Sequence, residues 1–192
     1  MPGMVAPFTD EREQLLAALA QQRYQLRLTA HGLTDDQARA THTPSALSVG
    51  GLIKHVTSTE SGWIDTVVER VPDIETATRA YEDNFRMRAD ETLDDVLTAF
   101  DEVARRTEAV VGDIADLLHP VPVPRDVPWY PDDLDAWTVR WVLLHLIQET
   151  ARHCGHADIV RELVDGATAF PLMAAAENWP ATPWMQPWTA DA

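Results

Sequence analysis

The segment TVRWVLLHLIQETARHCGHADIVRELVDG, residues 138–166, decides the fold of this chain. Apolar residues recur along it at helical spacing, namely Val139, Val142, Leu143, Leu146, Ile147, Ala157, Val160, Leu163 and Val164. This period predicts one long amphipathic helix. Thr138 is suited to cap its start, and Gly166 is suited to end it in a left-handed conformation.

Four polar residues lie on or beside the apolar side of this helix: His145, Glu149, His153 and His156. At about 100° per residue they fall in a stripe roughly 80° wide. Burying polar side chains costs free energy unless they are paired or bind something. In one interpretation they hydrogen-bond one another, and Glu149 reaches Arg152 or stays at the edge of the stripe. In the other, Glu149 and His153 bind a metal, and a further ligand must come from elsewhere in the chain.

The composition limits the classes of protein that fit. The 192 residues are 45% apolar, enough for a real core, and we expect a single domain over residues 1–192. The net charge of −16 argues against a nucleic-acid partner or an anionic membrane. We expect no signal peptide and no membrane span, because the N-terminus lacks a basic region followed by an apolar one and no apolar run is long enough to cross a bilayer. With Cys154 as the single cysteine, a disulfide framework is excluded, and a cytoplasmic protein is expected.

Three further long helices are predicted upstream. The first follows a cap at Thr9 and ends at Gly32, and the second begins at Ser48 and runs to about residue 71. The third begins at Thr92, in a sequence that is nearly a capping box, and keeps a clean helical period to Leu117. Four long amphipathic helices without strand-like alternation indicate an all-α four-helix bundle.

The connections are also distinctive. Residues 34–37 (TDDQ) form a capping box for a short helical turn, whereas residues 72–90 predict a long connection. Residues 119–137 hold five prolines, which exclude a continued helix and suggest an extended segment crossing the bundle. Beyond residue 166 comes an aromatic, proline-rich tail whose three tryptophans we expect to pack on the bundle.

Two polar residues of the second helix have open roles. His55 lies on its apolar side, where a lone histidine is more often a core residue than a ligand. Glu60 lies about one and a half turns further on, where it is either an acceptor beside the metal ligands or a solvated charge. Gly50 and Gly51, near the start of this helix, allow another backbone or a ligand to approach closely.

Three segments carry a resemblance to a known family: residues 48–63, 91–100 and, most specifically, 138–166 with LLHLIQETARHCGHADIVRELVDG. The sequence resembles the DinB-like superfamily, in particular the actinobacterial branch that includes mycothiol-dependent maleylpyruvate isomerase and related mycothiol S-transferases. The resemblance implies an up-down-down-up arrangement of the four helices. A composition with one lysine among fifteen basic residues fits a GC-rich actinobacterium.

The resemblance also implies a divalent metal bound by His55, Glu149 and His153. Many superfamily members have histidine in place of Glu149, and glutamate there matches the mycothiol isomerase type. His156 and Asp158 belong to the GHAD segment, and we assign them, like Glu60, to orienting the metal-bound side chains or to structural roles. Zinc is the expected ion, and nickel or iron would suit the same ligands.

The function that the resemblance implies is metal-dependent transfer of a low-molecular-weight thiol, mycothiol, to a small electrophile. A metal with an open position can deprotonate a thiol, so the protein needs no reactive cysteine. Cys154 lies about 100° from His153 around the helix and is expected to be a small buried hydrophobe. Trp63, Trp129 and Tyr130 are expected to line the pocket for the electrophile.

Two other functions stay open from the sequence. One is a non-catalytic metal-binding stress protein, and the other is a hydrolase that uses metal-bound water. A homodimer is expected from the resemblance alone.

Overall fold

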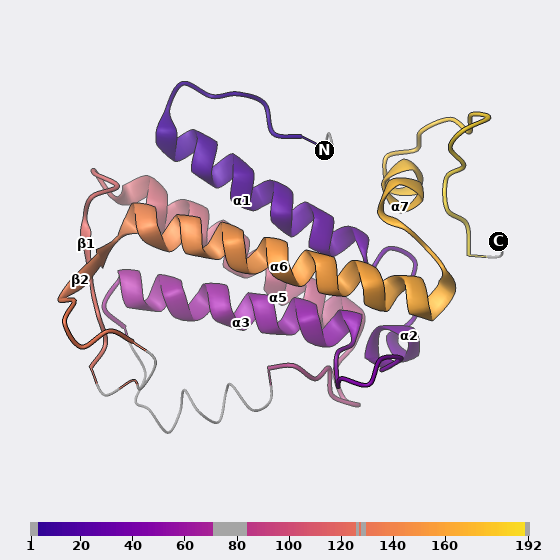
Figure 1. Ribbon diagram of the computed structural model, residues 1–192, viewed down its shortest axis with the longest axis horizontal. Coiled ribbons are helices and arrows are strands. Elements are labelled where there is room, and N and C mark those ends of the chain that lie inside the picture. Colours follow the sequence, from indigo (N-terminus) through magenta and orange to yellow (C-terminus); the bar gives the residue numbers. More distant parts are fainter. Residues whose placement is uncertain (1–3, 71–83, 126, 128–129, 191–192) are drawn as a thin grey trace.

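The computed structural model describes residues 4–70, 84–125, 127 and 130–190. Four long helices make up the bundle: α1 (Glu11–Leu28), α3 (Val49–Val67), α5 (Leu93–Asp113) and α6 (Val139–Asp165). Figure 1 shows α1 and α6 running in one direction and α3 and α5 in the other. In the bundle, α6 packs between α1 and α3, and α3 also packs on α5. The predicted all-α, up-down-down-up bundle is therefore confirmed.

The helix ends follow capping chemistry. The side chains of Thr138 and Ser48 accept hydrogen bonds from backbone N–H groups of the first turns of α6 and α3, as predicted. Gly166 ends α6 with a φ of 75°, the left-handed conformation that glycine adopts without strain. The predicted cap of α1 is wrong by one residue. Asp10 takes that place, since its carboxylate accepts the Glu13 N–H at 2.9 Å and suits the positive end of the helix dipole.

Short elements complete the fold: α2 (Asp35–Arg39), β1 (Pro120–Pro122), β2 (Ala136–Thr138) and α7 (Ala169–Ala176). The two strands pair antiparallel, with Val121 opposite Trp137, and lie at one end of the bundle (Figure 1). An extended conformation was predicted here, but this pairing was not. Three-residue strands are too short to show an alternating pattern.

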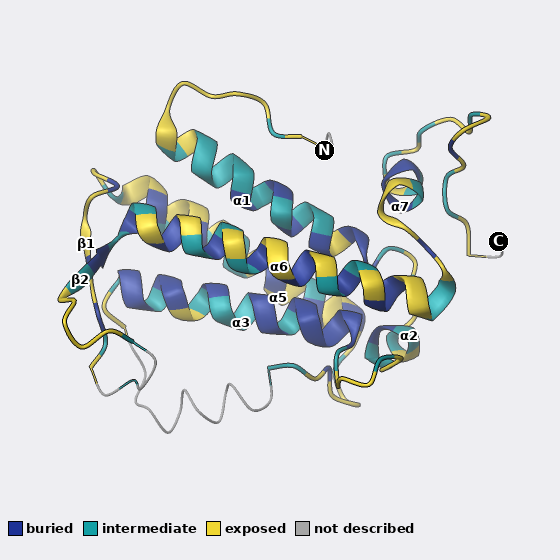
Figure 2. Cartoon of the chain, viewed as in Figure 1, coloured by how far each residue is buried: buried dark blue, intermediate teal, exposed yellow. Residues whose placement is uncertain are grey.

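The core divides into two apolar clusters with a polar layer between them. One cluster includes Leu26 and Phe100, and the other includes Leu19 and Val111. Along α1 and α5, these clusters are separated by Arg23 and Thr107, both of which are buried. Figure 2 shows bands of buried residues alternating with exposed ones along α6, whereas α3 is largely buried or partly buried.

The C-terminal tail packs on the bundle through Trp188. Its ring lies 4.9 Å from the guanidinium carbon of the buried Arg161 and meets His31 edge-on at 5.7 Å. The prediction of tail packing is confirmed for Trp188 and is wrong for Trp184, which is 81% exposed.

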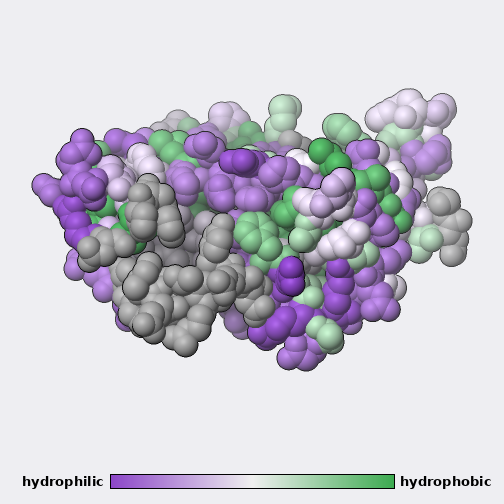
Figure 3. All heavy atoms as spheres, turned by 60° about the horizontal axis from the view of Figure 1, so that its bottom comes forward, coloured by the Kyte–Doolittle hydropathy of each residue, from purple (hydrophilic) through white to green (hydrophobic). Residues whose placement is uncertain are grey.

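The outer surface agrees with the acidic composition. Hydrophilic residues dominate the face shown in Figure 3, and hydrophobic residues gather there in smaller patches. Within the described ranges, no helix combines the length and the apolar character needed to cross a membrane.

Candidate metal centre

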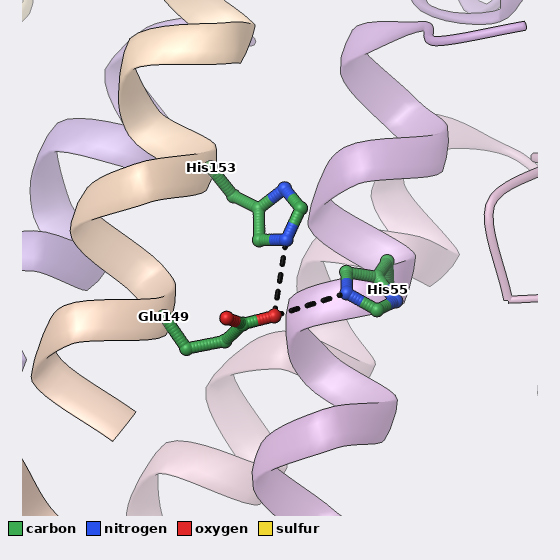
Figure 4. A group of neighbouring side chains, drawn as sticks. All are labelled: His55, Glu149 and His153. Carbon is green, nitrogen blue, oxygen red and sulfur yellow. Dashed lines mark hydrogen bonds and ion pairs between the residues drawn. The ribbon is translucent and has the colours of Figure 1, made fainter. Parts of the chain in front are cut away.

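The three residues predicted to bind a metal come together between α3 and α6. His55 projects from α3, and Glu149 and His153 project toward it from successive turns of α6 (Figure 4). Glu149 Oε1 lies 3.1 Å from His153 Nε2 and 3.5 Å from His55 Nε2. One ligand atom from each residue lies within 4.8 Å of those of the other two, so this cluster could bind a metal ion.

The local structure explains why these side chains converge. A four-residue separation places Glu149 and His153 on the same face of α6, one turn apart. The packing of α6 on α3 brings His55 to the same level, and the two imidazole rings lie 4.7 Å apart at 70°. Both histidines are buried, and Glu149 is partly buried.

The electrostatics of the cluster favour the protonation states that metal binding requires. Burial lowers the pKa of His55 and His153 below the ordinary value of imidazole, although Glu149 opposes this effect. Burial raises the pKa of Glu149, but the two imidazoles outweigh it and leave that pKa below its usual value. The cluster thus offers two neutral imidazoles and one carboxylate, a donor set that suits zinc and related divalent ions.

The two residues of the GHAD segment lie differently. His156 Nδ1 is 3.4 Å from His153 Nδ1, so His156 touches the ring nitrogen that would point away from a metal. In the described part of the chain, no hydrogen bond joins Asp158 to the three candidate ligands. Its partly buried carboxylate instead adds to the effect of burial, the larger cause, in raising the pKa of Cys154. A contact with His153 therefore supports an orienting role for His156. Within the described residues, no such contact supports that role for Asp158.

Glu60 has different partners from those proposed for it. The residue is 1% exposed, which contradicts the interpretation as a solvated charge. Arg23 donates two hydrogen bonds to its carboxylate, at 2.5 and 3.0 Å, and the Thr107 hydroxyl donates another at 2.5 Å. These partners come from α1 and α5, because the side chain points into the bundle. In the structure Glu60 belongs to the buried polar layer.

Aromatic residues pack beside the cluster. The Trp63 ring contacts Tyr130, Trp137, Trp141 and His145, at centroid distances of 4.8–6.0 Å. Trp137 of β2 and Trp141 and His145 of α6 also stack nearly parallel, in a row that leads toward Glu149. The four-residue spacing of Trp141 and His145 on the predicted helix could have shown their contact, which the sequence reasoning missed, whereas Trp137 joins the stack from β2. Trp129 lies outside the described residues.

Phe85 is a second neighbour that the sequence reasoning missed. Its ring stacks on His55 with a centroid distance of 3.8 Å and an angle of 17°. Phe85 falls in the connection between the second and third long helices, where no periodicity marks it. The one signal was the glycine pair at the start of α3, which allows the close approach of another backbone or a ligand.

Cys154 lies away from the candidate ligands, as predicted. Its thiol is buried, and Sγ donates to the Gln22 carbonyl of α1 at 3.2 Å. Burial raises the pKa of this thiol to about 12. A thiol in this state is inert, because the thiolate is the reactive form.

A four-helix bundle of up-down-down-up topology, with a His/Glu/His cluster between its second and fourth long helices, defines a DinB-like protein. The sequence model of the mycothiol-S-transferase family matches residues 14–166, so the chain belongs to this family. The crystal structure of a conserved protein from Enterococcus faecalis aligns with a TM-score of 0.58 at 14% identity. That alignment covers 83% of this chain and 100% of the other, and it shows the fold alone. Among proteins with curated functions, none matches this chain.

Proposed function

We propose that this protein transfers a low-molecular-weight thiol, mycothiol, to a small electrophile, using a divalent metal held by His55, Glu149 and His153. The observation that supports this most strongly is the convergence of two neutral imidazoles and a carboxylate in a member of the mycothiol-S-transferase family. Zinc is our first choice of metal, because this donor set resembles three-ligand catalytic zinc sites.

The residues fit such an ion in number, atom type and protonation state. Their ligand atoms lie within 4.8 Å of one another, so modest side-chain adjustments bring all three to one ion. A bound divalent ion would lower the pKa of a thiol from its free value of about 8.5 and so favour the thiolate. Glu149 supplies the one negative charge among the three ligands, which leaves a net positive site that attracts an anion.

The chain itself supplies no reactive sulfur. Its single cysteine, Cys154, is buried, has a raised pKa and is directed toward α1 rather than α3. The nucleophile must therefore come from a second substrate, as the transfer of an external thiol requires.

We place the electrophile beside the aromatic cluster of Trp63, Tyr130, Trp137 and Trp141. This cluster adjoins the ligands through His145, one helical turn before Glu149. Burial lowers the pKa of His145, so its imidazole is neutral near pH 7 and can accept a hydrogen bond from a substrate. Trp141 is 39% exposed and gives the cluster an accessible edge.

A cytoplasmic location and a homodimer remain predictions. The cytoplasm keeps thiols reduced, which suits a protein that consumes one. Sedimentation at several protein concentrations tests the dimer.

The test is metal analysis of the purified protein, followed by conjugation of monochlorobimane with mycothiol, bacillithiol or glutathione. We expect one divalent ion per chain and acceleration with mycothiol. This activity should be lost in Glu149→Ala and retained in Cys154→Ala, the matched control for the chain's own thiol. No acceleration with any thiol, together with an unchanged cobalt spectrum on thiol addition, would favour the non-catalytic alternative. Ester hydrolysis without thiol would favour the hydrolase.

A further inference from the structure

His55 lacks the contact that usually orients a metal-bound imidazole. Such a ring normally donates its second N–H to a carboxylate, a carbonyl or water, which fixes its orientation. In the described residues, Nδ1 of His55 is buried and has no hydrogen-bond partner. His153 differs, because its Nδ1 meets His156. Another group must therefore fix the His55 ring with Nε2 toward Glu149.

Phe85 is that group by geometry. Its ring covers one face of the imidazole, at a centroid distance of 3.8 Å and an angle of 17°. It also lies 6.2 Å from the His153 ring, so it flanks both imidazoles of the cluster. A stacked ring this close opposes rotation of the imidazole and keeps water from the covered face.

The backbone of Phe85 is held by a close approach to α3. A Cβ atom at Gly51 would lie 2.1 Å from the Phe85 carbonyl oxygen and 2.8 Å from its carbon. Only glycine allows the two backbones to come this near without a shift. The buried position of Gly51 thus sets the depth at which Phe85 reaches His55.

Two basic side chains hold the residues that follow Phe85. Lys54, the single lysine of the chain and the neighbour of His55, donates to the Arg86 carbonyl at 3.1 Å. It also pairs with Glu91 at 2.8 Å. Arg39 of α2 donates to the Arg88 carbonyl at 3.0 Å. These contacts join α2, α3 and the segment 85–91 into one support.

We propose that Phe85 is a positioning residue of the metal centre, holding the His55 imidazole in its ligand orientation by stacking where a hydrogen bond is missing. Gly51 and Lys54 act through Phe85 by fixing its backbone. The inference rests on the proposed function, because it takes His55 as a ligand. Its test measures the bound metal and does not depend on turnover.

The first experiment compares Phe85→Leu with Phe85→Tyr in cobalt-loaded protein. Phe85→Leu removes the ring, so we expect about tenfold weaker cobalt binding, the scale of losses around metal ligands, and an altered visible spectrum. Phe85→Tyr keeps the ring and should restore both. The matched control is Phe100→Leu in the α5 core, which should lower stability and leave cobalt affinity and spectrum unchanged.

The second experiment uses glycines of the same helix. Gly51→Ala should displace Phe85 and reproduce the cobalt properties of Phe85→Leu. Gly62→Ala is the control, because nothing lies within 4 Å of the Cβ that it adds. It should leave cobalt binding at the wild-type level.

The outcomes separate the two proposals. Wild-type cobalt affinity and spectrum in Phe85→Leu would overturn the positioning role, even if the protein conjugates thiols. A protein that loses cobalt affinity in Phe85→Leu and Gly51→Ala but conjugates no thiol would support the positioning role and contradict the proposed function. A wild-type protein that binds no divalent metal would overturn both.

Discussion

Replacing Arg23 with methionine should lower the free energy of unfolding by about 3–5 kcal/mol, the usual cost of leaving a buried charge without its partner. Arg23 is 5% exposed and Glu60 is 1% exposed, so water cannot solvate the carboxylate that remains. Methionine keeps much of the apolar stem of arginine, and the loss should therefore come mainly from the charge. The Thr107 hydroxyl stays as a partner, but one neutral donor does not replace a guanidinium.

The comparison with an exposed pair makes this magnitude testable. Arg140 and Glu11 lie 2.7 Å apart, but their side chains are 38% and 54% exposed. Exposed pairs contribute little to stability, so Glu11→Gln should cost much less than Arg23→Met. The double variant Arg23→Met/Glu60→Met removes both charges and should recover part of the stability lost in Arg23→Met.

Urea unfolding of the metal-free proteins measures the free energy of unfolding of the wild type, Arg23→Met, Glu11→Gln and the double variant. Metal content is measured separately on the folded samples. A cost below about 1 kcal/mol for Arg23→Met would refute the reasoning from burial. Metal content independently checks the position of Glu60. Its hydrogen-bond partners are Arg23 and Thr107 rather than the candidate metal ligands, so its charge should not affect metal binding. Folded Glu60→Gln should bind metal as the wild type does, and loss of metal would restore Glu60 to the metal centre.

Three further predictions follow from the site and its helices. His153→Ala should abolish stoichiometric metal binding, whereas His156→Ala should weaken it about 10–100-fold, as measured by competition with a chelator; full metal content in His153→Ala would contradict the ligand assignment. Gly62→Ala should raise the free energy of unfolding by about 0.5–1 kcal/mol, because it removes a glycine from the interior of α3 without a clash; a lower urea midpoint would contradict this. The metal-free protein should lose stability as the pH falls. Burial lowers the pKa of His31, His55, His145 and His153, so the folded state binds fewer protons than the unfolded state. Stability is therefore full above the unfolded histidine pKa of about 6.5 and declines as the pH falls below it. Urea midpoints that rise as the pH falls below about 6.5 would contradict this direction.

The parts of the fold that depend on local chemistry could be predicted from the sequence. The four long helices follow from apolar periodicity, and Ser48, Thr92 and Thr138 cap them as expected. The juxtaposition of Glu149 and His153 is equally local, since four residues along a helix fix it. His55 is different, because its pairing with α6 depends on which helices are neighbours. The family resemblance supplied that information, and periodicity did not.

Contacts between distant segments could not be predicted. Glu60 on α3 was compatible with a metal neighbour or with solvent, and its true partners lie 37 and 47 residues away in the sequence. Gly51 indicated a close approach, but a glycine does not say which segment approaches. Phe85 itself follows a polar stretch with no pattern, so only the three-dimensional structure relates it to His55.

The bundle topology explains why such a contact is available at all. The helices α3 and α5 run in the same direction, so the start of α5 lies at the same end of the bundle as the start of α3. The end of α3 and the start of α5 are therefore separated by about the length of α3, roughly 28 Å. A bundle of alternating directions joins its helices by short turns at their ends. Here the returning chain reaches the first turns of α3 before α5 begins, and Phe85 lies there against His55. The parallel helix pair thus allows a residue from outside the bundle helices to stack on a candidate metal ligand.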